Sequence, residues 1–207
     1  MGWIYAGRMT ALLVGGLVLP VLRGRRAGVK PVAVARAHRP IERLAGVGLS
    51  MSVGITALWS ILHSKLLGEM SLELDAPPGL QIAGLVVIGS GLAVLITGQV
   101  QMGPAWRLGI DRQSSDFVQR GLFSRVRHPI YSGFACVFLG AVAFSPAVPT
   151  AIVSSIGLVC LVAEARLEEA LLLEHLGDPY ARYMARTGRF LPRPSQAREA
   201  VSPIAKP

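Results

Sequence analysis

Long apolar blocks, separated by short segments that hold most of the charge, divide this chain. The blocks cover residues 5–22, 44–67, 80–100, 130–144 and 148–163. A membrane-spanning helix needs about 20 apolar residues, so the last two blocks are near the short limit for a span. Only 16% of the residues are charged, whereas a soluble domain carries about 25%. The sequence therefore predicts an all-α integral membrane protein with five transmembrane helices.

The first block, residues 5–22, has a second interpretation as a cleaved signal peptide. The small residues at 33–35 resemble a cleavage site, but they lie well beyond the apolar core and follow a strongly basic segment. A signal peptide is cleaved close to the end of its apolar region. We therefore expect this block to be a retained helix.

The sign of the charge on the segments between the apolar blocks predicts the orientation of the chain. The net charge is +9, and the excess lies in residues 23–43, in residues 101–127 and after residue 164, whereas residues 69–78 are acidic. Basic loops of membrane proteins stay in the cytoplasm. The pattern predicts a multi-pass protein of the cytoplasmic membrane with its N-terminus outside and its C-terminus inside. We expect anionic membrane lipids, not nucleic acid, to be the partner of the positive charge.

The last two blocks are joined by only three residues, 145–147, which include a proline. Such a short connection predicts a tight antiparallel helical hairpin whose two outer ends lie on the same side of the membrane. Residues 164–185 are amphipathic and predict a cytoplasmic helical extension of the fifth helix, interrupted at residues 177–179. The hairpin thus brings the start of the fourth helix next to the cytoplasmic extension.

Neither cysteine belongs to a recognisable metal-binding or disulfide pattern. Cys136 and Cys160 both lie inside apolar blocks, and neither has a CxxC neighbour or a nearby cluster of metal ligands. Buried cysteines of this kind usually act as small apolar residues. The sequence predicts no disulfide and no metal site.

Polar residues gather at the predicted entrance of the fourth helix. Arg127 and His128 directly precede Pro129, and proline is favoured in the first turn of a helix. The positive end of the helix dipole and the unpaired N–H groups of the first turn suit a polar ligand. We therefore expect a ligand-binding position beside Arg127 and His128.

A second polar group follows the fifth helix. Arg166 and Glu169 are three positions apart on the predicted helix and can form an ion pair, while Glu164 and Glu168 share one face. Ionisable groups close to the bilayer are usually paired or functional. Spacing alone leaves two interpretations open, an ordinary charged helix surface and a functional site.

Two motifs, in order around the hairpin, carry a resemblance to a known family. The motifs are Gly121-x-x-x-x-Val126-Arg127-His128-Pro129-x-Tyr131-x-Gly133 and Arg166-x-Glu168-Glu169-x-x-Leu172-x-x-x-x-Gly177-x-x-Tyr180-x-x-Tyr183-x-x-x-x-Gly188-Arg189-Phe190-x-Pro192. The chain resembles the isoprenylcysteine carboxyl methyltransferase family and the related bacterial phospholipid methyltransferases over residues 101–192. Each motif alone is weak, whereas the ordered pair is specific.

The resemblance implies a membrane enzyme that uses S-adenosyl-L-methionine to methylate a lipophilic small molecule or lipid, such as an isoprenylcysteine carboxylate. The residues that it assigns to the cofactor are His128, Pro129, Tyr131, Gly133, Glu168, Glu169, Tyr180 and Tyr183. The residues that it assigns to catalysis are Arg166, Arg127 and Glu169. In this assignment the arginines orient an acidic acceptor, and the two tyrosines of the tail close the pocket.

The resemblance also divides the chain into regions. Residues 1–100 would hold three transmembrane helices and a basic cytoplasmic loop, and residues 101–193 would form the catalytic core with its C-terminal cofactor-binding segment. The polar, proline-bearing residues 194–207 are predicted to be a disordered tail.

Other functions share parts of the same pattern. A phospholipid N-methyltransferase would use the same cofactor, and membrane reductases of the sterol-reductase type have a similar RHPxY hairpin but bind NADPH. A non-catalytic scaffold would use the motifs only to pack helices. The paired glutamates and the short chain favour a methyltransferase.

A carboxylate acceptor needs no general base, whereas an amine or thiol would pass its proton to Glu168 or Glu169. The sequence fixes neither the acceptor nor the oligomeric state.

Overall fold

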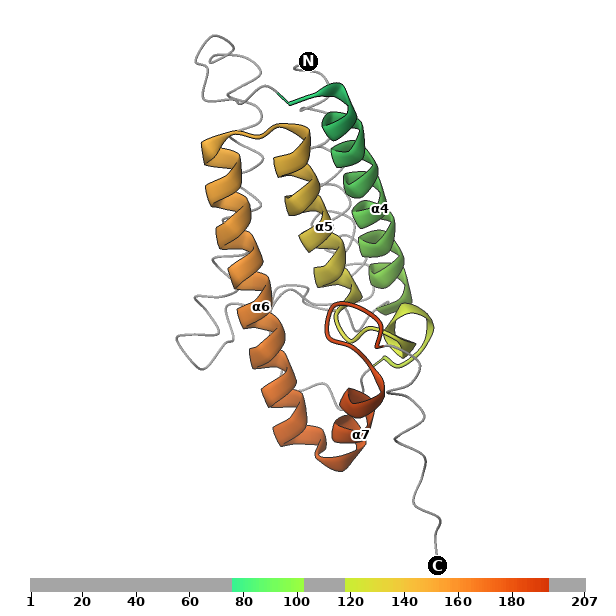
Figure 1. Ribbon diagram of the computed structural model, residues 1–207. Helices are drawn as coiled ribbons and strands as arrows, with labels where there is room; N and C mark the ends of the chain where they lie inside the picture. The colour runs from blue at the N-terminus through green and yellow to red at the C-terminus, as the bar shows by residue number, and fades with distance from the viewer. Residues whose placement is uncertain (1–75, 103–117, 194–207) are drawn as a thin grey trace, which may run out of the picture.

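The computed structural model describes residues 76–102 and 118–193, and these are almost entirely helical (Figure 1). The elements are α4 (Pro78–Met102), the short 3-10 helix η4 (Gly121–Ser124), α5 (Pro129–Phe144), α6 (Val148–Leu176) and α7 (Asp178–Arg186). Within these residues there is no β-strand, as the predicted all-α class requires. The predicted spans at 5–22 and 44–67 and the predicted tail at 194–207 lie outside the described residues.

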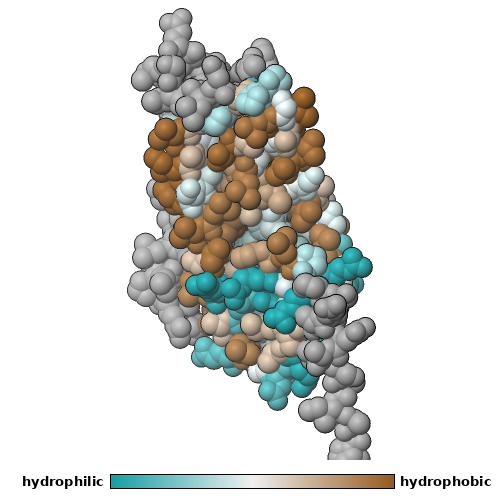
Figure 2. All heavy atoms as spheres, viewed as in Figure 1, coloured by the Kyte–Doolittle hydropathy of each residue, from teal (hydrophilic) through white to brown (hydrophobic). Residues whose placement is uncertain are grey.

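Two of these helices, α4 and α6, are long and apolar enough to cross a membrane. Their most apolar windows have mean hydropathies of 2.2 and 1.9, and only 22% and 33% of those windows is buried. The core helix of a soluble protein would instead be mostly buried. Large apolar side chains such as Ile82, Val86 and Val159 are more than half exposed, and Figure 2 shows apolar surface over most of this helical region. By length, composition and exposed apolar surface, these two helices are candidate membrane spans.

The predicted hairpin is present, and its ends agree closely with the sequence. α5 ends at Phe144 and α6 begins at Val148, so residues 145–147 form the connection. Proline occupies the first turn of both helices, where its missing N–H is not needed. α5 has 16 residues and α6 has 29, because α6 continues without a break beyond the predicted apolar span.

Gly177 separates α6 from α7. Its φ of 58° lies in the left-handed region, which glycine adopts without steric cost. Asp178 and Pro179 then begin α7, with an acidic residue and a proline in the first turn. The predicted helical extension therefore consists of the end of α6 and the separate helix α7.

The closest helix contact in the described part is between α4 and α5. A Cβ at Gly91 would lie 2.7 Å from the carbonyl oxygen of Gly133, and a Cβ at Gly133 would lie 2.7 Å from that of Gly91. Gly84 and Gly140 face each other in the same way, at 2.8 Å. Lipid is as apolar as the helix surface, so helices in membranes associate largely through such close contacts. Gly133, which was expected to line the cofactor, lies at this contact.

Apolar side chains join these helices at the end where α5 begins. The cluster consists of Leu95, Phe123, Ile130, Phe134, Phe138 and Leu161. It includes residues from α4, η4, α5 and α6, so it fixes η4 and the start of α5 against the other helices. Figure 2 shows a hydrophilic band that borders the apolar surface near this end of the helices.

Substitution of Gly91 tests the α4–α5 contact. We expect Gly91→Ala to lower the free energy of unfolding by about 1–3 kcal/mol, because the backbone of α5 blocks the added methyl group. Gly89→Ala is the matched control, since it is on the same helix with no atom within 4 Å of the added Cβ. Thermal unfolding in detergent measures both, and equal midpoints for the two variants would contradict the contact.

Candidate functional site

The chain just before α5 is paired through its backbone with the chain just after α7. The Arg127 N–H donates to the carbonyl of Gly188 at 2.8 Å, and the His128 N–H donates to that of Arg189 at 3.0 Å. The Gly188 N–H donates in return to the carbonyl of Arg125 at 3.1 Å. The sequence predicted that N–H groups beside Arg127 and His128 would be available to a ligand. Instead, the carbonyls of Gly188 and Arg189 accept hydrogen bonds from the N–H groups of Arg127 and His128.

Gly188 is required for this pairing. A Cβ at this position would lie 1.7 Å from the carbonyl oxygen of Leu191, which is closer than two non-bonded atoms can approach. The tight turn also brings the carbonyl of Phe190 to α5, where the Ser132 hydroxyl donates to it at 2.7 Å. The Gly188-Arg189-Phe190 motif thus folds back onto the start of α5.

The carboxylate of Glu169 joins α6 to both of these segments. Its Oε1 is 2.7 Å from Arg127 Nε and 3.4 Å from His128 Nε2. Its Oε2 accepts from Arg189 Nε at 2.9 Å and Nη2 at 2.5 Å. The side chains of Glu169 and Arg127 are 4% and 7% exposed. We call Arg127, His128, Glu169 and Arg189 the Glu169 cluster.

This environment holds Glu169 in its charged form. Burial by itself raises the pKa of a carboxyl group, but the nearby His128 ring and the hydrogen bonds from Arg189 and Arg127 outweigh it. The pKa of Glu169 therefore lies well below its ordinary value of 4.5. A carboxylate of this kind is suited to holding cations in place and is a poor proton acceptor near neutral pH.

The rest of the Arg127 guanidinium is used by the end of α7. Its Nη1 donates to the carbonyl of Met184 at 3.0 Å and to the carbonyl of Thr187, and it lies 3.4 Å from the Thr187 hydroxyl. Cations commonly satisfy the last carbonyls of a helix in this way. All of these contacts of the Arg127 guanidinium are with groups of the protein itself, and its expected role toward an acidic acceptor stays a prediction.

Glu168 lies at the edge of the cluster and is more accessible. Its side chain is 28% exposed, its Oε2 accepts from the Tyr131 hydroxyl at 3.3 Å, and the same oxygen is 3.5 Å from His128 Nδ1. The rings of His128 and Tyr131 are parallel, with centroids 5.3 Å apart, and Phe190 lies next to His128 at 6.2 Å. One accessible carboxylate and three aromatic rings therefore come together here; we call this group the Glu168 subsite.

Two buried tyrosines lie on α7, and one of them, Tyr183, fastens this helix to η4. Tyr180 and Tyr183 are 2% and 4% exposed, and their tilted rings lie 5.8 Å apart. The Tyr183 hydroxyl donates to the carbonyl of Phe123 in η4 at 2.7 Å. Burial raises the pKa of Tyr183 to about 12. Both residues lie beside the Glu169 cluster, as expected, but they are packed into the protein.

Two other predicted site residues have different surroundings from those expected. Arg166 is exposed and has no ion pair within the described ranges, so the predicted Arg166–Glu169 pair is not formed. Arg127 and Arg189 hold Glu169 instead, because Arg166 lies on the outer side of α6. Pro129 is fully buried at the start of α5. Its position supports the helix entrance, and its contact with a cofactor stays a prediction.

Arg189 and Thr187 take part in the cluster in ways that sequence reasoning missed. Arg189 is part of the second motif, but the pattern gave no sign of its pairing with Glu169. Thr187, which is 2% exposed, accepts from Arg127 and donates to the carbonyl of Tyr183 at 2.6 Å. The only sequence signal for either was Gly188 between them, which permits the tight turn.

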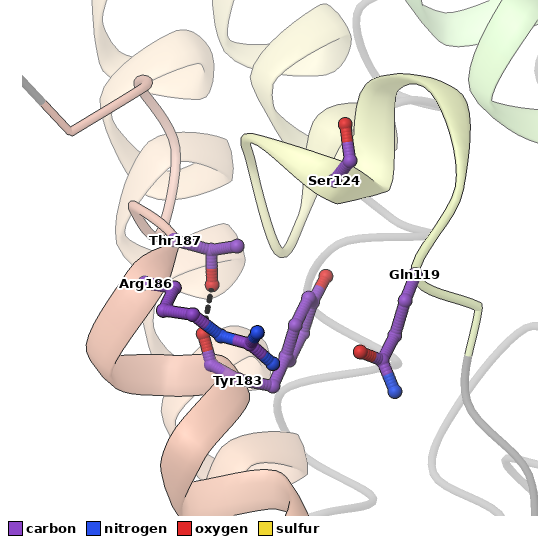
Figure 3. Close-up of a pocket in the computed structure, with 5 residues that line it drawn as sticks. All are labelled: Gln119, Ser124, Tyr183, Arg186 and Thr187. Carbon is purple, nitrogen blue, oxygen red and sulfur yellow. Dashed lines mark hydrogen bonds between the residues drawn. The ribbon is translucent and has the colours of Figure 1, made fainter. Parts of the chain in front are cut away.

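A separate pocket of about 320 Å³ lies between η4 and α7 (Figure 3). The residues that line it are Gln119, Ser124, Tyr183, Arg186 and Thr187.

In the described part of the chain, no group of His, Cys, Asp and Glu has the arrangement of a metal site. In comparisons with known proteins, no family model and no curated sequence matches the chain.

Replacement of Glu169 tests the cluster through stability. We expect Glu169→Gln to lower the free energy of unfolding by about 3 kcal/mol at neutral pH, because it leaves buried Arg127 without its counter-charge. Glu174→Gln, at an exposed position on the same helix, is the control and should change little.

The same pair of variants gives a pH dependence. A carboxyl whose pKa is lowered by folding stabilises the protein above its ordinary pKa, and this stability is lost as the pH falls. The difference in unfolding midpoint between the wild type and Glu169→Gln should therefore be constant near neutral pH and shrink below pH 4.5. A difference that is unchanged at low pH would contradict the charged state of Glu169.

Proposed function

We propose that the chain is a membrane methyltransferase that uses S-adenosyl-L-methionine to methylate a lipophilic acceptor, such as an isoprenylcysteine carboxylate. The observation that carries the proposal is the Glu169 cluster. It brings Arg127-His128, Glu169 and Arg189, which belong to three separate parts of the motif pair, into direct contact. The contact supports a common role for Arg127, His128 and Glu169, which the resemblance assigns to one site, and it adds Arg189 to them.

The groups around Glu168 fit this cofactor chemically. S-adenosyl-L-methionine carries an ammonium group and ribose hydroxyls, which donate hydrogen bonds, and a flat adenine ring. The Glu168 carboxylate can accept such bonds, and it is partly exposed. The rings of His128 and Tyr131 offer flat apolar surface, and Arg189 is 34% exposed and suits the cofactor's carboxylate. When bound, the cofactor supplies an electrophilic methyl group on a positively charged sulfur.

The protein's own contribution in this proposal is mainly positioning. Methyl transfer needs the acceptor atom, the methyl carbon and the sulfur in line, so holding both reactants fixed lowers the barrier. Glu169 holds the start of α5, α6 and the C-terminal segment together. The Glu168 subsite is built from residues of these same three segments, so the Glu169 cluster fixes their positions. The apolar outer surface of α4 and α6 ends at the same level, so the tail of a lipophilic acceptor can lie along it while the reactive head meets the polar residues.

The acceptor can also be a phospholipid amine, and one feature favours this second candidate. A carboxylate acceptor needs no base, whereas an amine must lose a proton. Glu168 is the partly exposed carboxylate next to the stacked rings, and within the described residues its hydrogen bond comes from the Tyr131 hydroxyl. It is therefore the residue that we assign as proton acceptor if the substrate is an amine. An NADPH-dependent reductase is less well supported, because the Arg127 guanidinium is buried and bound by Glu169 and is therefore not available for phosphates.

Calorimetric titration of the detergent-purified chain with S-adenosylhomocysteine tests the proposal, with NADPH titrated in parallel. We expect S-adenosylhomocysteine alone to bind. Glu168→Gln should weaken this binding by about tenfold, because an uncharged amide replaces a charged hydrogen-bond acceptor. Glu174→Gln again serves as the control for charge on α6.

The outcomes separate the candidate functions. Binding of NADPH alone would favour the reductase, and binding of neither ligand in detergent and in lipid nanodiscs would contradict both enzymes. Labelled methyl transfer to a farnesylated cysteine analogue or to phosphatidylethanolamine then distinguishes carboxylate from amine acceptors. Loss of transfer to the amine in Glu168→Gln at saturating cofactor would identify Glu168 as the base.

A further inference from the structure

The pocket between η4 and α7 is separate from the Glu168 subsite and has its own polar groups. It has a volume of about 320 Å³, and Tyr183 and Thr187 form its inner wall. Arg186 reaches it from the end of α7, while Gln119 and Ser124 come from the chain before α5. Figure 3 shows the Arg186 guanidinium and the Gln119 amide on the two sides of the Tyr183 ring. None of Gln119, Ser124 and Arg186 has a role in the proposed methyl transfer.

Two hydrogen-bond donors at this pocket are uncommitted within the described residues. The only bond of the Arg186 guanidinium there runs from Nε to the carbonyl of Arg182, at 3.3 Å, so both terminal nitrogens remain available. The Gln119 side chain makes no hydrogen bond within the same ranges. The tightly bound Arg127 provides a contrast, since its guanidinium is held by Glu169 and by the carbonyl of Met184. A cation and an amide that face one pocket in this way suit an oxyanion.

The surrounding charge also favours an anion. Among the described residues no acidic side chain lines the pocket, and the exposed Arg120 and Arg125 flank η4. The end of a helix carries partial negative charge that would repel an anion. In α7 this charge is neutralised, because Arg127 binds the carbonyl of Met184 and Arg193 binds that of Ala185.

We infer that this pocket binds a phosphate group, carried by an anionic lipid headgroup or as free phosphate, between Arg186 and Gln119. Anionic lipids are the expected partners of basic residues at a membrane surface. η4 follows α4 and packs on the apolar cluster at the end of the helices, so the pocket lies where headgroups would be found if α4 crosses the membrane. Binding there would hold α7 against η4 and so support the Met184 and Thr187 carbonyls that Arg127 uses.

The test is calorimetric titration of the full-length chain, purified in an uncharged detergent, with dioctanoyl phosphatidylglycerol. Inorganic phosphate and zwitterionic dioctanoyl phosphatidylcholine are titrated in parallel. We expect saturable binding of phosphatidylglycerol that weakens by about tenfold in Arg186→Gln, since one charge-assisted contact is lost. Gln119→Met, which removes the amide but keeps the length of the side chain, should also weaken binding.

Arg182→Gln is the matched control, because it removes the same charge from an exposed position one turn earlier on α7, outside the pocket. Its affinity should equal that of the wild type. Tight binding of phosphatidylglycerol with weak binding of inorganic phosphate identifies a lipid headgroup, and equal affinities identify free phosphate. The inference is overturned if neither anion saturates, if phosphatidylcholine binds equally well, or if Arg182→Gln weakens binding as much as Arg186→Gln does. The assay needs no methyl transfer, so it stands independently of the proposed enzyme activity.

Discussion

A single buried carboxylate, that of Glu169, determines how the polar end of this protein is built. Taking an ion out of water costs several kcal/mol, and only close, well-oriented counter-charges offset that cost. Its counter-charges come from Arg127 before α5 and Arg189 after α7, at 2.7 and 2.5 Å. The three segments must therefore meet whenever Glu169 is buried. The backbone pairing of Arg127 with Gly188 is the second part of the same arrangement, since it sets Arg189 at the right position.

Two kinds of contact hold the described helices together, close backbone packing at glycines and ionic hydrogen bonds. Along the apolar length, glycines let α4 and α5 touch backbone to backbone, as at Gly91 and Gly133. Helices in lipid gain little from hydrophobic burial, so close packing has to replace it. Beyond the apolar length, ions and hydrogen bonds take over at the Glu169 cluster. The apolar cluster around Phe123 lies between the glycine contacts and the Glu169 cluster. The backbone carbonyl of Phe123 also accepts a hydrogen bond from the Tyr183 hydroxyl, which attaches α7 to this cluster.

The sequence predicted the helices well because their limits are set locally. Pro129 marks the start of α5, and Gly177 with Pro179 separates α6 from α7 through conformations that few other residues adopt. The partner of Glu169 was predicted less well, because spacing along one helix favoured Arg166. Long-range pairing depends on how the chain turns after α7, which the Gly188 turn decides and no periodic pattern records. The predicted topology and the first two spans concern residues that the structure does not describe, and they remain predictions.

Adjacent glutamates on α6 have unlike surroundings, and this difference bears on how a site could work here. Consecutive residues on a helix point about 100° apart, so Glu169 faces the cations while Glu168 reaches the edge beside Tyr131. A carboxylate fixed by two arginines has little capacity left to bind or exchange a proton. It can, however, hold the backbone of its neighbour still. The backbone of Glu168 is therefore held in place while its carboxylate stays partly exposed. A residue that positions reactants needs both of these properties.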